Sequence, residues 1–388
     1  MDVMRLANTS EIYLDNNATT KVLPAVASAA VSAMCEYFGN PSSIHTAGDR
    51  SREIIRLARA DVAELLGCDS SSLCFTGSGT ESNNIILSSS VSWSDKPRVI
   101  TSNVEHSSIL SLCDHLEDHD YEVIRVPVGQ SGLLDMRAFK AALNSATALV
   151  SIQWVNNETG VVQPVEEIGA LCREAGVLFH TDAAQAVGKL PITLSKFPID
   201  FVSLTGHKLH APQGVGVIYA RDFSKLRPIM FGGTQENGLR PGTENLAGIA
   251  GIGKAASIRR LSLAKIVSCL NEFRKLFEKR LLESIPDIVV NGVNAPRVCN
   301  TTNVLFEGVD GQALVARLDQ AGIRCSQSSA CTNQRPEPSY VLKAMGLSED
   351  QAYASVRFSF SELNTHEEIE MTVKILATLC AQLRAFNS

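Results

Sequence analysis

Residues 177–220 read VLFHTDAAQAVGKLPITLSKFPIDFVSLTGHKLHAPQGVGVIYA, and three short apolar runs in this stretch predict β-strands. The runs are VLFHTD (177–182), DFVSL (200–204) and GVGVIYA (214–220). Back to about Leu73, similar runs alternate with helical patterns such as ESNNIILSSS (81–90) and PVEEIGALCREAG (164–176), where Gly176 occupies a helix C-cap position. This alternation predicts an α/β fold, with a mostly parallel sheet and helices on its faces.

The pattern changes after about Glu244. Residues 246–284 are helical in pattern, and further strands are predicted in TTNVLFEG (301–308) and ASVRFSF (354–360). A helix is predicted at 310–322, and a final helix begins at about His366. This α+β arrangement predicts a second, smaller domain. We place the large domain at 16–260 and the small domain at 261–388 together with 1–15.

The length, net charge and apolar runs of the chain argue against nucleic acid or a membrane as its partner. The 388 residues can bury a core without disulfides or metals, and the formal net charge of −6 offers no basic field for nucleic acid or an anionic membrane. No run of 18 apolar residues predicts a membrane span, and the N-terminus lacks the features of a signal or transit peptide. We therefore expect a cytoplasmic protein with no direct nucleic-acid or membrane partner.

The chain has ten cysteines but no C-x-x-C pair, so the common zinc, thioredoxin and iron–sulfur spacings are absent. Cys74 and Cys172 lie in apolar segments and are predicted to be core residues. Cys331 differs because it lies among small and polar residues, in SSACTNQRPEPSY (328–340), on a predicted exposed loop. Taken alone, this segment is more typical of an inert loop thiol.

A phosphate site is indicated by FTGSGTES (75–82), which follows a strand and opens a helix. Free N–H groups at a helix start, together with the helix dipole, bind phosphate. The dinucleotide fingerprint requires a glycine where Ser82 stands, so a nicotinamide cofactor is weakly supported. The alternative is a plain glycine-rich turn.

Two residues of the opening stretch carry reactive groups. Lys208 lies between the apolar runs 201–204 and 215–219, and a lysine in such surroundings has a lowered pKa and can attack an aldehyde. Asp182 ends a strand of the predicted parallel sheet, where such sheets bind ligands. Asp182 could instead cap a helix. Together, however, the acid and the amine are what pyridoxal 5'-phosphate (PLP) requires.

Ten short motifs then occur in a fixed order. They are YLDNNATT, GNPSSIH, GTESNN, EHSSIL, VNNETG, HTDAAQ, GHK, LRPGTEN, SSACT and VRFS. With them the chain resembles the NifS/IscS-type cysteine desulfurases of group I, from about Tyr13 to the C-terminus. These enzymes belong to the class V aminotransferase family and have the fold type I of PLP-dependent transferases.

The resemblance implies an activity and a set of site residues. PLP-dependent removal of sulfur from L-cysteine would give L-alanine and a persulfide on Cys331, which an acceptor protein would receive. Lys208 would hold the cofactor covalently, and His106 would stack on its ring and move protons. Arg357 would bind the substrate carboxylate, near Asn157. The cofactor-binding set would be Lys208, Asp182, Gln185, Gly79, Thr80, Thr205, His207, Thr243, Asn157 and His106, with no metal. Thr243 would reach the phosphate of a neighbouring subunit, which implies a homodimer.

Other functions remain open at this point. A selenocysteine lyase shares the scaffold, another class V enzyme such as an aminotransferase would not need Cys331, and a non-enzymatic sulfur or iron–sulfur carrier would bind no PLP. The sulfur acceptor is not specified: iron–sulfur cluster assembly, tRNA thiolation, cofactor synthesis and DNA phosphorothioation are all compatible.

Three segments have patterns that resemble nucleotide-binding, metal-binding or basic sites. GIAGIGKA (248–255) resembles a nucleotide-binding loop, but Ala255 replaces the required Ser or Thr, so we predict a helix start. His115 and His119 lie four residues apart near Cys113, on what we interpret as a solvated helix face. SIRRLSLAK (257–265) is interpreted as an exposed basic face. His210 departs from the family pattern, which more often has an aromatic or small residue there.

Overall fold

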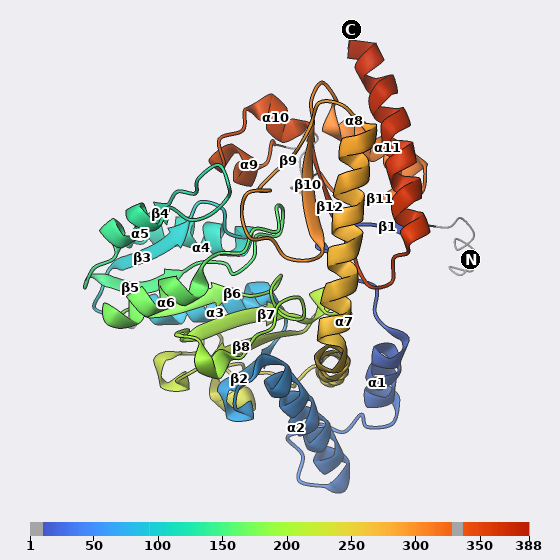
Figure 1. Cartoon of the computed structure of the whole chain (residues 1–388). Helices are drawn as coiled ribbons and strands as arrows, with labels where there is room; N and C mark the ends of the chain where they lie inside the picture. The colour runs from blue at the N-terminus through green and yellow to red at the C-terminus, as the bar shows by residue number, and fades with distance from the viewer. Residues whose placement is uncertain (1–10, 93, 328–336, 388) are drawn as a thin grey trace.

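The computed structural model describes residues 11–92, 94–327 and 337–387. Its centre is a seven-stranded sheet in the order β2-β8-β7-β6-β5-β3-β4 (Figure 1). The strands are β2 (Leu73–Thr76), β3 (Arg98–Ser102), β4 (Glu122–Val126), β5 (Thr147–Ser151), β6 (Leu178–Asp182), β7 (Phe201–Thr205) and β8 (Gly216–Ala220). Within this sheet, β8 runs in the opposite direction to the other six strands. The predicted α/β class and mostly parallel sheet are confirmed.

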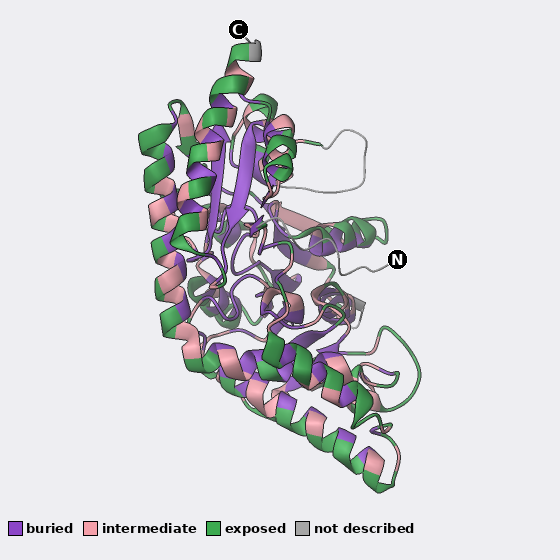
Figure 2. Ribbon diagram, turned by 90° about the vertical axis from the view of Figure 1, so that its right-hand side faces the viewer, coloured by how far each residue is buried: buried purple, intermediate pink, exposed green. Residues whose placement is uncertain are grey.

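Helices cover both faces of this sheet, which is why β5, β7 and β8 are buried at every position (Figure 2). Side chains alternate between the two faces: Leu149 packs with α3 (Gly79–Ser92) and α4 (Ser107–Glu117), whereas Val150 packs with α5 (Met136–Ala142) and α6 (Val165–Glu174). Helix α6 ends before Gly176, whose φ of +65° confirms the predicted cap. Cys74 and Cys172 are buried, as predicted.

A second layer is built on the 39-residue helix α7 (Leu246–Ser284), which packs against α1 (Pro24–Cys35) and α2 (Thr46–Leu66). The glycine-rich segment 248–255 lies inside α7 rather than in a phosphate loop. A Cβ at Gly253 would lie 2.5 Å from Cα of Ala58, and one at Gly251 would lie 2.5 Å from Cδ of Pro212. The glycines therefore serve close helix packing, and the predicted helix start is confirmed.

The C-terminal part is a three-stranded antiparallel sheet in the order β12-β10-β9. Its strands are β9 (Ile288–Val290), β10 (Thr301–Phe306) and β12 (Ser355–Ser359), and its long helices are α8 (Gly311–Gln320) and α11 (His366–Asn387). A two-residue strand β1 (Ile12–Tyr13) pairs with β11 (Ile323–Arg324), so the N-terminus joins this part. The remaining elements are α9 (Tyr340–Ala344), α10 (Glu349–Tyr353) and the 3-10 turns Ser70–Ser72, Leu194–Lys196, Gly206–Lys208, Phe223–Lys225 and Gln235–Gly238.

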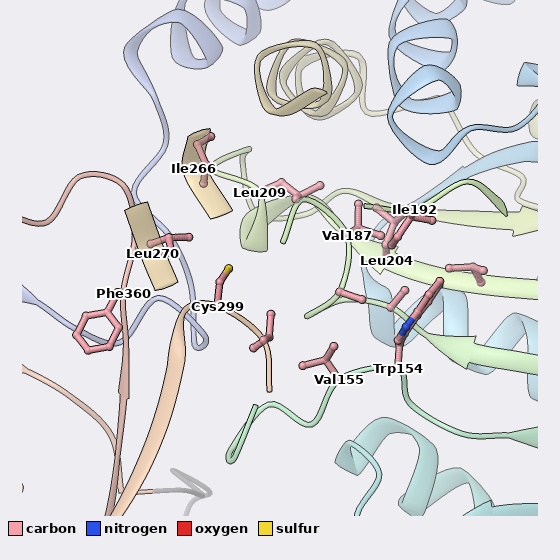
Figure 3. Packing of buried hydrophobic residues seen from close by; sticks show 14 of the residues in the cluster. Trp154, Val155, Val187, Ile192, Leu204, Leu209, Ile266, Leu270, Cys299 and Phe360 are labelled. Atoms are coloured by element: carbon pink, nitrogen blue, oxygen red, sulfur yellow. The ribbon is translucent and has the colours of Figure 1, made fainter. Parts of the chain in front are cut away.

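One apolar cluster connects the two parts of the molecule. It includes Trp154 and Leu204 at the large sheet and Leu270 and Phe360 at the small one (Figure 3). Helix α7 continues without interruption through position 260, where we predicted the domain boundary. That boundary therefore remains a prediction.

The basic segment 257–265 is not uniformly exposed, and our interpretation was wrong for one residue. Arg260 is exposed and pairs with Glu64, but Arg259 is buried and pairs with Glu362 at 3.0 Å. Arg259 faces inward because it lies on the side of α7 that packs on the core. Among the described helices, none is both long and apolar enough to cross a membrane.

Candidate active site

A cavity of about 690 Å³ lies where the parallel strands of the large sheet end. Residues at or after the carboxyl ends of β3, β5, β6 and β7 form its walls, together with the start of α3. Open α/β sheets bind ligands at this edge. The predicted site residues that line it are Gly79, Thr80, His106, Asn157, Asp182, Gln185, Thr205, His207, Lys208 and Arg357.

Lys208 ends the 3-10 turn that directly follows β7, and it lines the cavity. Its Nζ donates to the carbonyl of Ala18 at 2.5 Å and also to the carbonyl of Asn17. Burial and the positive charge of Arg357 lower the pKa of Lys208 to about 8. Near neutral pH a useful fraction of this amine is unprotonated and nucleophilic.

Asp182 is the last residue of β6, and both of its carboxylate oxygens accept hydrogen bonds. The amide of Asn83 donates to Oδ2 at 2.9 Å, and the backbone N–H of Ala184 donates to Oδ1 at 2.9 Å. The chain after Asp182 forms turns rather than a helix, so the alternative of a helix cap is wrong. The carboxylate is thus held in place beside the cavity.

Asn83, on α3, joins Asp182 to His106. Its Nδ2 also donates to Ser108 Oγ at 2.9 Å, and its Oδ1 accepts from Ser203. The hydroxyl of Ser108 lies 2.8 Å from Nδ1 of His106. The expected partner of the cofactor's ring nitrogen and the expected ring-stacking histidine therefore belong to one hydrogen-bond network, which is buried at Asn83 and Ser108.

His106 caps the N-terminus of α4, where the backbone N–H of Ser108 donates to Nδ1 at 3.1 Å. Because that nitrogen accepts, a neutral His106 carries its proton on Nε2. The preceding residue, Glu105, is fully buried, and burial raises its pKa to about 8. The hydroxyl of Tyr340 donates to the Glu105 carbonyl at 2.5 Å, which ties α9 to this wall.

One end of the cavity suits a phosphate. Gly79 and Thr80 begin α3, and a Cβ at Gly79 would lie 3.4 Å from Cβ of Thr205. Burial and the nearby charge of Lys208 lower the pKa of His207 to about 4. The carboxylate of Glu81, which also starts the helix, pairs with Arg240 at 2.8 Å. Its negative charge is therefore offset at the end of the helix where an anion would bind.

The other end of the cavity suits a carboxylate. Arg357, on β12, is buried, and its guanidinium donates to Asp15 at 2.7 Å and to the carbonyl of Asn157 at 3.2 Å. Two buried polar atoms in the described part of the chain have no hydrogen-bond partner at this point: Nε of Arg357 and Oδ1 of Asn157. Buried polar groups are usually paired, so Nε of Arg357 is available to a carboxylate of a ligand and Oδ1 of Asn157 to a donor group of a ligand.

This set of residues fits PLP. A buried amine with a lowered pKa can bind the aldehyde covalently, a fixed carboxylate can hold the ring nitrogen protonated, and a helix N-terminus can bind the phosphate. The unpartnered Arg357 and Asn157 atoms supply polar contacts that the protein alone leaves unused. Asp182, Lys208 and both ends of the cavity lie around one volume of about 690 Å³.

Two predicted site residues are not among those described at the cavity. Thr243 is exposed and does not line the cavity. Cys331 lies outside the described residues. The described residues hold no group of three or more His, Cys, Asp or Glu side chains placed for a metal. His119 instead bonds back to the His115 carbonyl at 2.8 Å.

Sequence reasoning missed several residues of the cavity wall, among them Asp15, Asn17, Asn83, Gln153 and Tyr340. Asp15 and Asn17 are in the motif YLDNNATT and Asn83 is in GTESNN, so the motifs themselves carried a signal. Gln153 and Tyr340 had no local signal, because their role depends on where two distant segments meet.

Comparisons with known proteins agree with this geometry. The model of the family described as Aminotransferase class-V matches residues 12–371. The chain is 42% identical over 379 residues to a cysteine desulfurase of Nostoc sp., covering 97% of this chain and 95% of that protein. It is 42% identical over 377 residues to cysteine desulfurase NifS of Azotobacter vinelandii, covering 97% and 94%.

The fold has a similarly close match. A solved NifS-like protein superposes with a TM-score of 0.90 at 32% identity, covering 96% of this chain and all of the other. The match of the family model over most of the length, together with these identities, shows the family. The chain belongs to the class V aminotransferases, a family of PLP-dependent enzymes.

Proposed function

We propose that this protein is a cysteine desulfurase, which converts L-cysteine to L-alanine and transfers the sulfur to Cys331. The observation that carries the proposal is the cavity in which Lys208, Asp182 and Arg357 converge, in a chain 42% identical to cysteine desulfurases. When bound, PLP withdraws electrons from Cα of the amino acid, which makes the Cα–H and the bond to sulfur easier to break.

The residues of the cavity would divide the work. Lys208 would bind the aldehyde and, once displaced by the substrate amine, carry the α-proton. Asp182 would keep the pyridine nitrogen protonated, and Gln185 would donate to the ring oxygen. His106 would stack on the ring and donate or take a proton through Nε2. Arg357 would hold the substrate carboxylate, and Asn157 would lie near both the ring and the substrate. The start of α3 with Thr205 and His207 would bind the phosphate.

Cys331 would receive the sulfur of the substrate. Its thiolate would attack the substrate sulfur, so that an S–S bond forms while the C–S bond breaks and its electron pair stays with carbon. Uptake of protons by the carbon skeleton then gives alanine, and the enzyme keeps the sulfur as a persulfide. Described residues before and after Cys331 in the sequence support this proposal. Ser326 lines the cavity and forms a β-bridge with Arg357, and Tyr340 also lines the cavity.

Further aspects of the proposal concern partners. We infer a homodimer in which Thr243 contacts the phosphate site of the second copy, because Thr243 is exposed and does not line its own cavity. Exposed apolar side chains such as Phe38, Ile44 and Phe231 are compatible with a covered surface. The persulfide would pass to an acceptor protein, for which iron–sulfur cluster assembly and tRNA thiolation are candidate processes. The domain boundaries at 260 and 261 also remain part of this proposal.

The test uses the purified protein loaded with PLP. Wild type should show a visible absorption band and form alanine from cysteine in the presence of a thiol reductant. Lys208→Ala should lose the band, because the covalent link is missing. Cys331→Ser should keep the band and form no alanine. Normal alanine formation by the serine variant would refute the assigned nucleophile, and faster turnover of selenocysteine without Cys331 would favour a selenocysteine lyase.

A further inference from the structure

A second buried lysine lies behind the cavity, and the proposed mechanism does not use it. Lys189 is 7% exposed and stands in a turn after β6, four residues beyond Gln185. Its Nζ donates to Oε1 of Gln185 at 2.5 Å and to Oδ1 of Asn17 at 3.2 Å. A buried lysine is costly, so its retention beside a ligand cavity calls for an explanation.

The hydrogen bonds around Gln185 leave its amide one orientation. Protonated Lys189 can only donate, and its Nζ donates to Oε1 of Gln185, so the amide oxygen faces Lys189. The backbone carbonyl of Asn17 can only accept, and it accepts from Nε2 of Gln185 at 3.0 Å. Two independent neighbours therefore impose the same orientation on a side chain that could otherwise rotate by half a turn.

One donor of Gln185 is left over. An amide nitrogen carries two hydrogens, and the bond to Asn17 uses one of them. Gln185 lines the cavity, so the second hydrogen is available to an acceptor there. Had the amide the opposite orientation, its oxygen would face the cavity and repel an anionic acceptor.

We propose that Lys189 is a positioning residue that locks the amide of Gln185 with its nitrogen towards the cavity, where the ring oxygen of PLP accepts from it. This inference rests on the proposed function, since it assigns Gln185 to the cofactor's ring. Lys189 acts only through Gln185 and Asn17 and does not line the main cavity.

The electrostatic surroundings of Lys189 agree with this role. Burial lowers its pKa to about 7; the Cys299 thiol acts in the opposite direction, and the positive charges of Lys208, Arg259 and Arg357 lower it further. Cys299 lies in the apolar cluster that joins the two parts of the molecule (Figure 3). Lys189 donates to Gln185 whether or not it is protonated, because either form of the amine carries N–H groups.

The test follows the visible absorption of the PLP-loaded enzyme as a function of pH. A hydrogen bond to the ring oxygen favours its anion and lowers the midpoint of the spectral change. In Lys189→Met the amide keeps only one of its two restraints, the Asn17 carbonyl, and can turn its oxygen towards the cavity. The midpoint should therefore rise, by up to about one pH unit, the size expected when an anion loses a hydrogen bond. Lys189→Arg, which still donates, should restore most of the wild-type value.

Two controls separate positioning from a general structural effect. Lys196→Met removes an exposed lysine seven residues further along and should leave the midpoint unchanged. Gln185→Met should raise the midpoint by itself, and adding Lys189→Met to it should have no further effect, because the two residues act in series. If Lys189→Met is not recovered as folded protein, Lys189→Gln carries the same test, since a freely rotating amide cannot impose one orientation.

The outcomes are distinct from those of the functional test. An unchanged midpoint in Lys189→Met or Lys189→Gln would overturn the inference, and so would an equal rise with and without Gln185. Both results would leave a wild-type enzyme with a visible band and alanine formation. Absence of the band or of alanine in wild type would overturn the proposed function instead.

Discussion

Lys208 has the chemical state that attack on an aldehyde requires, and this state comes from its position. Burial, followed by the charge of Arg357, moves its pKa from 10.5 to about 8. Apoprotein should therefore take up PLP at a rate that rises with pH, is half-maximal near pH 8 and is constant above about pH 9, because only the unprotonated amine reacts. Stopped-flow absorbance after mixing with PLP measures this rate.

The variant Arg357→Met provides the comparison. Removing the positive charge should move the half-maximal pH upwards, because one of the influences that lower the pKa of Lys208 is gone. A wild-type rate that continues to rise beyond pH 10 would contradict the assigned environment of the amine.

Asn83 can be tested in the same region. Its amide donates both to Asp182 and to Ser108, so Asn83→Leu leaves a half-buried carboxylate without one of its donors. The loss of a hydrogen bond to a charged group costs about 1.5–3 kcal/mol, so PLP affinity should fall by roughly 10- to 100-fold. Fluorescence titration of apoprotein with PLP measures the affinity.

The neighbouring Asn84 supplies a control for Asn83. It is partly exposed, and its amide bonds only locally to the carbonyl of Thr80 at 2.9 Å. Asn84→Leu should change the affinity by less than about threefold, within the range of ordinary surface substitutions. Equal losses in both variants would mean that α3, and not the contact to Asp182, is responsible.

At the scale of secondary structure, α7 depends on glycines at its crossing with α2. In Gly253→Val the new Cβ would fall 2.5 Å from the Cα of Ala58, which is backbone and cannot rotate away. Overpacking of this kind destabilises by about 1–3 kcal/mol. The thermal unfolding midpoint of the apoprotein should fall accordingly, whereas Lys254→Ala, at the next and exposed position, should leave it nearly unchanged. A midpoint at the wild-type value in Gly253→Val would contradict the packing described.

Strands of the large sheet could be predicted from sequence because β5 and β7, buried on both faces, consist of apolar residues with only Ser and Thr among them. Asp182 ends the neighbouring strand β6 and Lys208 lies in the turn after β7, so the centre of the site could be predicted from the same patterns. The part of the cavity wall that comes from the N-terminal segment could not be predicted in this way. Asp15 and Asn17 reach the cavity through the pairing of the two-residue β1 with β11, more than 300 residues away, and a strand this short has no periodic signal.

At the scale of the whole molecule, a buried ionic cluster ties α7 to both parts of the chain. Glu362, just after β12, lies 3.0 Å from Arg259 and 3.4 Å from His210, which follows the lysine turn. His210 has a left-handed φ of +63° and is buried, with Nδ1 2.7 Å from the carbonyl of Lys21. The histidine that departs from the family pattern is therefore part of this cluster, and the cluster sits directly behind Lys208.

This cluster gives stability a defined dependence on acid. Burial alone would raise the pKa of Glu362, but the hydrogen bond from His210 and the charge of Arg259 outweigh it and lower the pKa to about 2, from 4.5. Because the folded-state pKa is depressed, the stabilisation is complete above pH 4.5 and is lost as the pH falls towards 2. The shift corresponds to about 3 kcal/mol.

Glu362→Gln should therefore destabilise the apoprotein by about 3 kcal/mol at pH 7, since it leaves Arg259 buried without its counter-charge. The gap between variant and wild type should narrow as the pH drops below 4.5, because wild type then loses the same interaction by protonation. Thermal unfolding of both proteins from pH 7 to pH 3 measures the gap. Glu64→Gln, which removes the exposed partner of Arg260 one residue further along α7, should cost less than about 1 kcal/mol at every pH. A constant gap across the whole pH range would show that Glu362 stabilises the fold by packing rather than by charge.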